Sequence, residues 1–195
     1  MEQLNKRMLA FFSTLWPAEE KRLVFGEGNG ASPRLMLIGE APGEQETLQG
    51  RPFVGKAGKN LDGFLDVVGL HRPDIWISNV VKVRPTKVSD KGRISNRPPS
   101  REELALFTPY LYEEIALVKP GVIVTLGNVA LQAMLGAKAV IGDHHGQLAE
   151  ASINGSAVRV FPLYHPASII YNRSLAQVYQ QDLSALRQLL DAHVI

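Results

Sequence analysis

The stretch Arg34–Glu44 (RLMLIGEAPGE) decides the fold, because an unbroken apolar run ends abruptly in glycine, proline and acidic residues. Such a run is typical of a strand that is buried on both faces of a sheet. Three similar apolar runs follow along the chain: Ile75–Val81, Val122–Leu126 and Val158–Tyr164. Helical patterns separate these runs, and strands that alternate with helices indicate an α/β protein with a parallel sheet covered on both faces.

Start and stop signals support the intervening helices. Apolar residues at helical spacing over 61–68 precede Gly69, which is a predicted helix stop. Ser100 and Glu103 form a capping box at the start of the next helix. Two further amphipathic patterns predict helices over 127–135 and 175–190.

The composition limits the class of protein. The 195 residues, 45% of them apolar, fit a single domain over 1–195 with a real core. No apolar run approaches the roughly 18–20 residues of a membrane span, and residues 1–20 predict an amphipathic helix instead of a signal peptide. The absence of cysteine excludes disulfides, thiolate metal sites and a cysteine nucleophile. We expect a cytoplasmic monomer without a membrane segment.

The net charge of +2 conceals an uneven distribution. Residues 82–101 contain seven basic residues and one acid, so the rest of the chain is net acidic. Much of this block falls in 85–99, a polar, proline-containing stretch that we interpret as a long basic loop. Long loops in compact domains are often functional, and a basic one suits a nucleic-acid backbone. Composition alone leaves open whether the loop binds DNA or only aids solubility.

Polar and small residues gather where the predicted strands end. Gly39–Glu44 follow the first strand, Asn79 lies near the end of the second, Gly127–Asn128 follow the third, and His165 follows the fourth. Open α/β sheets bind ligands beyond the carboxyl ends of their strands. A buried asparagine needs hydrogen-bond partners, so Asn79 is bonded either by neighbouring backbone or by a ligand.

Two other motifs fail on inspection. Gly50–Ala57 resembles a P-loop, but Ala57 stands where Ser or Thr must hold Mg²⁺, and the preceding strand ends ten residues earlier. The adjacent His144 and His145 point apart and lack a third ligand, so no metal site is expected.

Four motifs in order resemble the uracil-DNA glycosylase superfamily, and within it the family 4 type of bacteria and archaea. They are Gly39–Glu46, Gly50–Gly55, Asn79–Lys82 and His165–Ala167. Each motif alone is weak, but all four at compatible spacing are specific. The resemblance implies a three-layer αβα sandwich around a central four-stranded parallel sheet. It also implies a DNA glycosylase that hydrolyses the N-glycosidic bond of uracil in single- or double-stranded DNA and leaves an abasic site.

The same resemblance implies roles for residues around a flipped-out uracil. Phe53 would stack on the base, and Asn79 would donate to its C4 carbonyl and accept from N3–H. His165 would donate to uracil O2 as negative charge develops there. Glu40 and the backbone around Ala41 would line the sugar and the attacking water. Ala41 cannot activate water, as an aspartate does in another branch, so the general base stays open.

Further implied contacts lie around that pocket. Glu46 is a second acidic position of the first motif, and Ile169 or Ile170 would wedge into the duplex where the base leaves. The residues implied to contact the DNA backbone are basic: Lys82, Arg84 and Arg173.

The cysteine count is the main departure from the resembled family. Family 4 members usually carry four cysteines that ligate an iron–sulfur cluster, at positions near Phe12–Leu15, at Val83 and at Phe107. Without cysteine this cluster is absent, and the apolar replacements predict a site refilled by core. The segment between the last two positions also looks expanded, through Thr86–Asn96. We therefore expect no cofactor.

Two alternatives remain open on the sequence. One is a glycosylase for another deaminated base, such as hypoxanthine or xanthine. The other is a non-catalytic nucleic-acid-binding relative, against which the intact Glu40, Asn79 and His165 argue.

Overall fold

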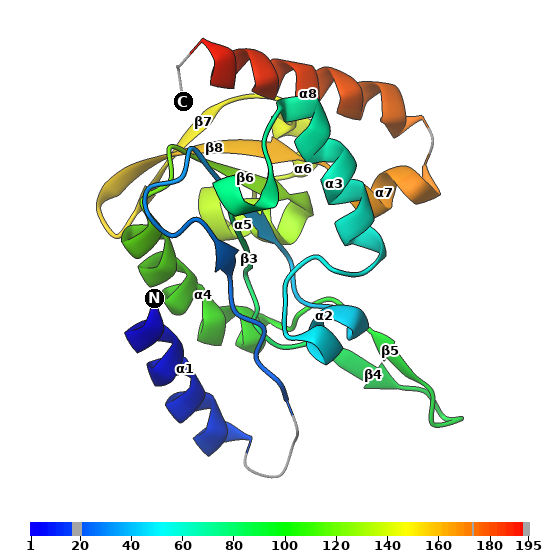
Figure 1. Ribbon diagram of the computed structural model, residues 1–195. Helices are drawn as coiled ribbons and strands as arrows, with labels where there is room; N and C mark the ends of the chain where they lie inside the picture. The colour runs from blue at the N-terminus through cyan, green and yellow to red at the C-terminus, as the bar shows by residue number, and fades with distance from the viewer. Residues whose placement is uncertain (17–20, 173, 193–195) are drawn as a thin grey trace.

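A six-stranded mixed sheet forms the centre of the computed structural model, which describes residues 1–16, 21–172 and 174–192 (Figure 1). Four neighbouring strands run parallel, in the spatial order β3 (Trp76–Asn79), β2 (Leu35–Gly39), β6 (Val122–Leu126) and β8 (Ser156–Leu163). The strand β1 (Glu27–Gly28) pairs antiparallel with β3, and β7 (Ala149–Ile153) pairs antiparallel with β8. The expectation of a four-stranded parallel sheet is therefore right for the central strands and wrong for the whole sheet.

The sequence did not predict the two edge strands β1 and β7, and the reason is physical. A strand of two residues is too short to show any period, and β7 alternates half-buried residues with exposed ones instead of forming an apolar run. Continuous hydrophobic runs mark only strands that are covered on both faces.

Helices cover both faces of the sheet (Figure 1). Met36 and Ile38 of β2 belong to a core with α1, α4 and α5, whereas Leu35 and Leu37 point the opposite way into a core with α3 and α8. Alternation along a strand requires this division. The helices are α1 (Glu2–Leu15), α2 (Glu44–Gln49), α3 (Lys56–Val68), α4 (Arg101–Val118), α5 (Gly127–Leu135), α6 (Ile141–His144), α7 (Pro166–Tyr171) and α8 (Leu175–Asp191), with a 3₁₀ turn, η1 (Arg72–Asp74).

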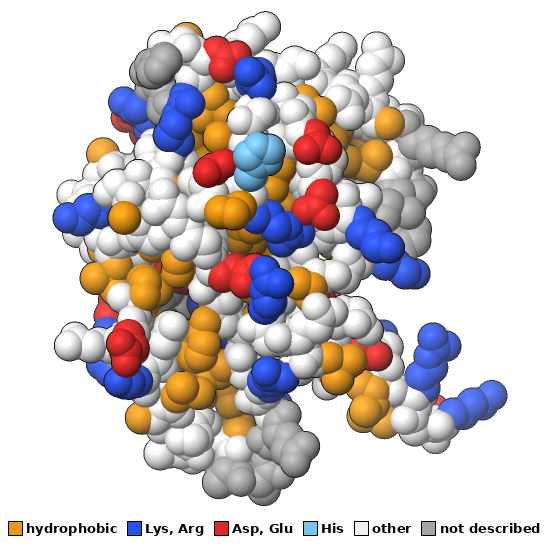
Figure 2. All heavy atoms as spheres, viewed as in Figure 1, with side chains coloured by type: hydrophobic (Ala, Val, Ile, Leu, Met, Phe, Trp, Pro, Cys, Tyr) orange, Lys and Arg blue, Asp and Glu red, His pale blue; other side chains and the backbone are white. Residues whose placement is uncertain are grey.

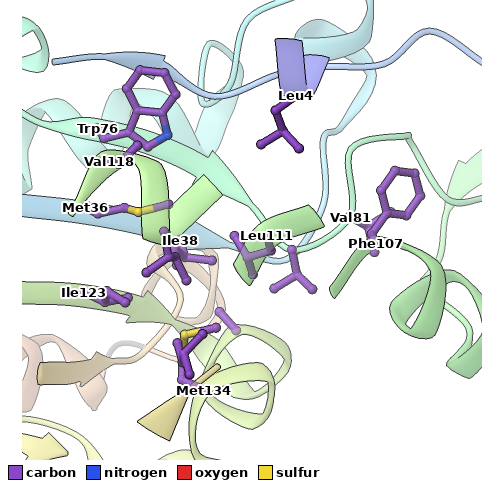
Figure 3. Packing of buried hydrophobic residues seen from close by; sticks show 14 of the residues in the cluster. Leu4, Met36, Ile38, Trp76, Val81, Phe107, Leu111, Val118, Ile123 and Met134 are labelled. Carbon is purple, nitrogen blue, oxygen red and sulfur yellow. The ribbon is translucent and has the colours of Figure 1, made fainter. Parts of the chain in front are cut away.

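The predicted helix signals act as expected. Ser100 Oγ accepts from the Glu103 amide at 3.2 Å, and the Glu103 carboxylate accepts from the Ser100 amide at 2.7 Å, which caps α4. Gly69 ends α3 with a left-handed backbone. Figure 3 shows part of the first core, in which Met36, Ile38 and Leu111 lie together. Across the described ranges, no helix is long and apolar enough to cross a bilayer.

The expected basic loop over 85–99 contains regular structure. Strands β4 (Thr86–Val88) and β5 (Ile94–Asn96) form an antiparallel hairpin that projects from the body of the molecule (Figure 1). Its strands carry mainly polar and basic residues, so no hydrophobic alternation revealed them.

Candidate active site

A pocket of about 740 Å³ opens beyond the carboxyl ends of β2, β3 and β8. The parallel strands bring together there the segments that the sequence separates by more than a hundred residues. The hairpin forms one side of the pocket through residues 93–96. The sequence-predicted site residues that line it are Glu40, Ala41, Glu46, Phe53, Asn79, Arg84 and His165.

Gly39, the last residue of β2, lets two of these side chains meet. A Cβ atom at this position would lie 2.5 Å from the Phe53 ring and 2.5 Å from Oδ1 of Asn79. Neither distance is compatible with a side chain at position 39, so the glycine is required for close approach of the ring and the amide. The aromatic ring and the side-chain amide thus border one small volume.

The side-chain amide of Asn79 has an unusual environment. The residue is 3% exposed, and in the described part of the chain no protein group hydrogen-bonds to its side chain. Its backbone carbonyl, in contrast, accepts from Lys82 Nζ at 2.7 Å. Buried amides are normally paired, so this amide is poised for a partner that enters the pocket.

Phe53 is held in a strained backbone conformation. Its φ of 52° lies in the left-handed region, which costs on the order of 1–3 kcal/mol for a residue other than glycine. Arg72 of η1 donates to the Phe53 carbonyl at 2.7 Å, and its guanidinium also binds Asp62 at 2.8 Å. The ring is 5% exposed and contacts the second core. Arg72 therefore holds the backbone of Phe53 in this conformation.

Glu46 connects the two loops that form the rim. Its Oε1 accepts from the amides of Val54 at 3.0 Å and Gly55 at 2.7 Å, and its Oε2 accepts from the Gly43 amide at 3.1 Å. Three backbone donors occupy the carboxylate. The geometry therefore gives this acidic residue a positioning role, in which it holds the Phe53 loop against the first motif.

The tautomer of His165 follows from its backbone contact. Its Nδ1 accepts from the Ala167 amide at 3.1 Å, at the N-terminus of α7. An accepting Nδ1 in neutral imidazole leaves the proton on Nε2, which is then a donor. Burial lowers the pKa of His165 below 6.5, so the neutral form dominates at pH 7.

Glu40 follows β2 directly and lines the same pocket. Burial raises the pKa of its carboxyl above 4.5, because desolvation disfavours the charged form. An anionic carboxylate in partial burial can stabilise a developing cation more strongly than one in bulk water.

The expectation that Lys82 contacts DNA is wrong. Its side chain is 0% exposed, and Nζ binds Glu114 of α4 at 2.6 Å and Ser78 Oγ at 2.5 Å. Glu114 also accepts from Trp76 Nε1 at 2.8 Å. A lysine whose donors are all taken by buried partners cannot reach a phosphate. It instead supports the end of β3, from which Asn79 points into the pocket.

The other expected DNA contacts differ in position. Arg84 lies at the rim, where it binds Glu44 at 2.9 Å and Asn96 Oδ1 at 2.8 Å. Ile169 of α7 is half-buried against the second core, outside the pocket lining. The side chain of Ile170 and all of Arg173 lie outside the described residues.

Comparison with known proteins identifies the class. The sequence pattern of the uracil DNA glycosylase superfamily matches residues 25–189, and the chain belongs to this superfamily. It is 37% identical over 180 residues to the type-4 uracil-DNA glycosylase of Saccharolobus solfataricus, covering 90% of this chain and 79% of that protein. It is 34% identical to the type-4 enzyme of Thermotoga maritima, covering 97% and 94%. The crystal structure of Pedobacter heparinus SMUG2 shares the fold, with a TM-score of 0.54 at 16% identity, over 82% of this chain and 77% of that one.

The iron–sulfur cluster expected of family 4 does not fit this chain. Apart from the missing cysteines, Phe12 and Phe107 stack with ring centroids 4.2 Å apart, and both pack in one core with Val83. Trp16 also packs on Phe12, with ring centroids 5.0 Å apart, and lies 6.4 Å from Phe107. Aromatic and aliphatic carbon fills this region and offers no ligand to iron. Elsewhere in the described chain, no group of three or more His, Asp or Glu is placed to hold a metal ion.

Sequence reasoning missed two residues that shape the site. Arg72 sits in a short turn with no motif around it, and its role depends on a carbonyl 19 residues earlier. Asn96 lies in the hairpin and reaches the rim through Arg84. Neither carries a local signal, although the basic block drew attention to the segment that contains Asn96.

Proposed function

We propose that this protein is a monofunctional uracil-DNA glycosylase that hydrolyses the N-glycosidic bond of deoxyuridine in base excision repair. The observation that carries the proposal is the meeting of the Phe53 ring with the unpartnered amide of Asn79 across Gly39. A planar base that stacks on the ring offers its edge to the amide. Uracil presents an acceptor at C4 and a donor at N3, which satisfy the amide when its nitrogen faces C4 and its oxygen faces N3, and cytosine mismatches that orientation.

Charge develops in two places as the glycosidic bond breaks. The departing uracil becomes an anion, and neutral His165 donates from Nε2 to its O2. The sugar acquires oxocarbenium character, and the Glu40 carboxylate lies in the same pocket to stabilise it or to orient water. The bond from C1′ to N1 breaks heterolytically, water adds to C1′, and the water's proton neutralises the base.

The named relatives support this chemistry. Type-4 uracil-DNA glycosylases of two organisms align over 90% and 97% of this chain. Together with the pocket, these similarities favour uracil over the non-catalytic alternative.

The decisive experiment is excision from uracil-containing oligonucleotides. Wild-type protein should convert single- and double-stranded substrates to abasic product, and Asn79→Asp should reduce the rate at least about 100-fold while DNA binding persists. Asn154→Asp is the matched control, because Asn154 lies exposed at a turn remote from the pocket lining. Folded wild type that releases no uracil refutes the proposal. A panel of oligonucleotides with hypoxanthine and xanthine tests the alternative substrates. Release of either purine without release of uracil would replace uracil as the proposed substrate.

A further inference from the structure

The β4–β5 hairpin is fixed at its base and free at its tip. Arg97 binds Glu103 through two bonds of 2.6 and 2.8 Å and donates to the Thr86 carbonyl at 3.0 Å. Arg84 ties Asn96 to Glu44 across the pocket rim. These contacts hold the hairpin at a defined angle to the pocket, so its outer half presents a fixed surface.

An apolar pair occupies that outer half. Val88 and Ile94 lie directly opposite each other in the register and are 67% and 58% exposed. Asn96 is two residues from Ile94, so both side chains share one face of the hairpin. Ile94 and Asn96 also line the pocket. The apolar pair therefore continues the pocket wall outward.

Three cations lie next to this pair along the hairpin, and strand alternation directs Lys87 and Arg93 toward the opposite face. Lys87, Lys91 and Arg93 are exposed, and within the described part of the chain none of them forms an ion pair. Asp90 is the one acid of the hairpin. Figure 2 shows basic side chains gathered at the hairpin tip, clear of the body. By contrast, three of the block's four other basic residues, Lys82, Arg84 and Arg97, are each bound to a glutamate.

We propose that this hairpin face binds the DNA strand that carries the target base, on a nucleotide beside the one that enters the pocket. Val88 and Ile94 pack against the sugar and base of that neighbour, and the long side chains of the three cations reach the strand's phosphates from the edges and tip of the hairpin. Charge complementarity and continuity with the pocket carry the assignment. An exposed aliphatic pair on a two-stranded hairpin gains most from such a cover, because no second layer packs on it in the free protein. The proposal rests on the proposed function for the identity of the strand.

The apolar and charged contributions can be tested separately. Val88→Thr with Ile94→Thr keeps β-branching and hairpin propensity while it removes apolar surface. This double variant should raise the Kd for single-stranded uracil DNA at least about fivefold, with an unchanged salt dependence. The slope of log K against log salt is negative for a protein that binds phosphates. Replacement of Lys87, Lys91 and Arg93 by Gln should make this slope less steep by about 2 on the same DNA. The binding probe carries 2′-fluorodeoxyuridine, which resists glycosidic cleavage.

A matched control uses exposed aliphatics elsewhere. Leu9 and Leu117 are 50% and 51% exposed on α1 and α4, and Leu9→Gln with Leu117→Gln should leave Kd and excision unchanged. Thermal melting of every variant confirms that the fold is intact.

Wild-type affinity in the Val88→Thr/Ile94→Thr variant overturns the proposal. A loss seen only with duplex also overturns it, because the contact would then lie on the complementary strand. Wild type that binds through the hairpin without excising uracil refutes the proposed function and leaves the strand contact standing.

Discussion

Replacement of Lys82 by methionine tests the buried network behind the pocket. The substitution keeps a long side chain but removes the charge that faces Glu114, which is 1% exposed. Glu114 retains Trp76 Nε1 and Ser78 Oγ as donors, and both are neutral. Breaking a buried pair from one side costs about 3–5 kcal/mol, because an uncompensated charge stays behind. For a chain of this size that corresponds to a melting temperature lower by roughly 6–20 °C.

A second substitution makes the reasoning refutable. In Lys82→Met with Glu114→Gln, the amide oxygen can accept from Trp76 and the amide nitrogen can donate to Ser78, so no buried charge remains. We expect the double variant to return to within about 1 kcal/mol of wild type in urea unfolding at pH 7, with an unchanged m-value. A single variant within about 1 kcal/mol of wild type, or a double variant no more stable than the single one, refutes the argument. DNA binding by the double variant should keep the wild-type salt slope, since the lysine is buried.

Three further perturbations probe the pocket and the core. Glu40→Gln should lower excision about 100-fold or more, yet raise the melting temperature at pH 8. Because the folded pKa is raised above 4.5, ionisation destabilises the fold, and this stability difference should vanish as the pH falls below 4.5. Gly39→Ala should lower kcat/KM at least about 100-fold by separating ring and amide, while Gly63→Ala, whose Cβ meets nothing within 4 Å, should keep full activity. Phe107→Ala should cost about 3–5 kcal/mol in chemical unfolding, because it empties the aromatic stack.

Local patterns were sufficient to predict the parallel centre of the sheet and the order of the site segments. The strands β2, β3 and β6 are buried along their whole length, so each appears as a continuous apolar run. Since such strands end at one edge, residues that follow them converge without any further information. The pocket residues Glu40, Asn79 and His165 were accessible to prediction for this reason.

The failures around the site share one cause, which is contacts that form only when separate segments fold together. Lys82 stands among surface cations in the chain, and nothing nearby indicates burial against a glutamate 32 residues later. Glu46 was recognised as an acidic position, but its three backbone donors appear only once two loops fold together. The hairpin strands of three residues are stabilised by Arg84 and Arg97, so their conformation depends on ion pairs that no period records.

The segment after β3 explains how the pocket and the cluster-free core coexist. Asn79 points into the pocket, and only four residues later Val83 packs in the core with the Phe12–Phe107 stack. Between them, the Val80 and Val81 amides donate to the carbonyls of Gly39 and Glu40, and the Lys82 carbonyl accepts from Val24. Apolar burial, backbone bonds and the Lys82–Glu114 pair thus fix this segment at every residue. A metal crosslink at position 83 would add no constraint that Asn79 lacks, so the Asn79 amide keeps its place in the pocket without a cluster.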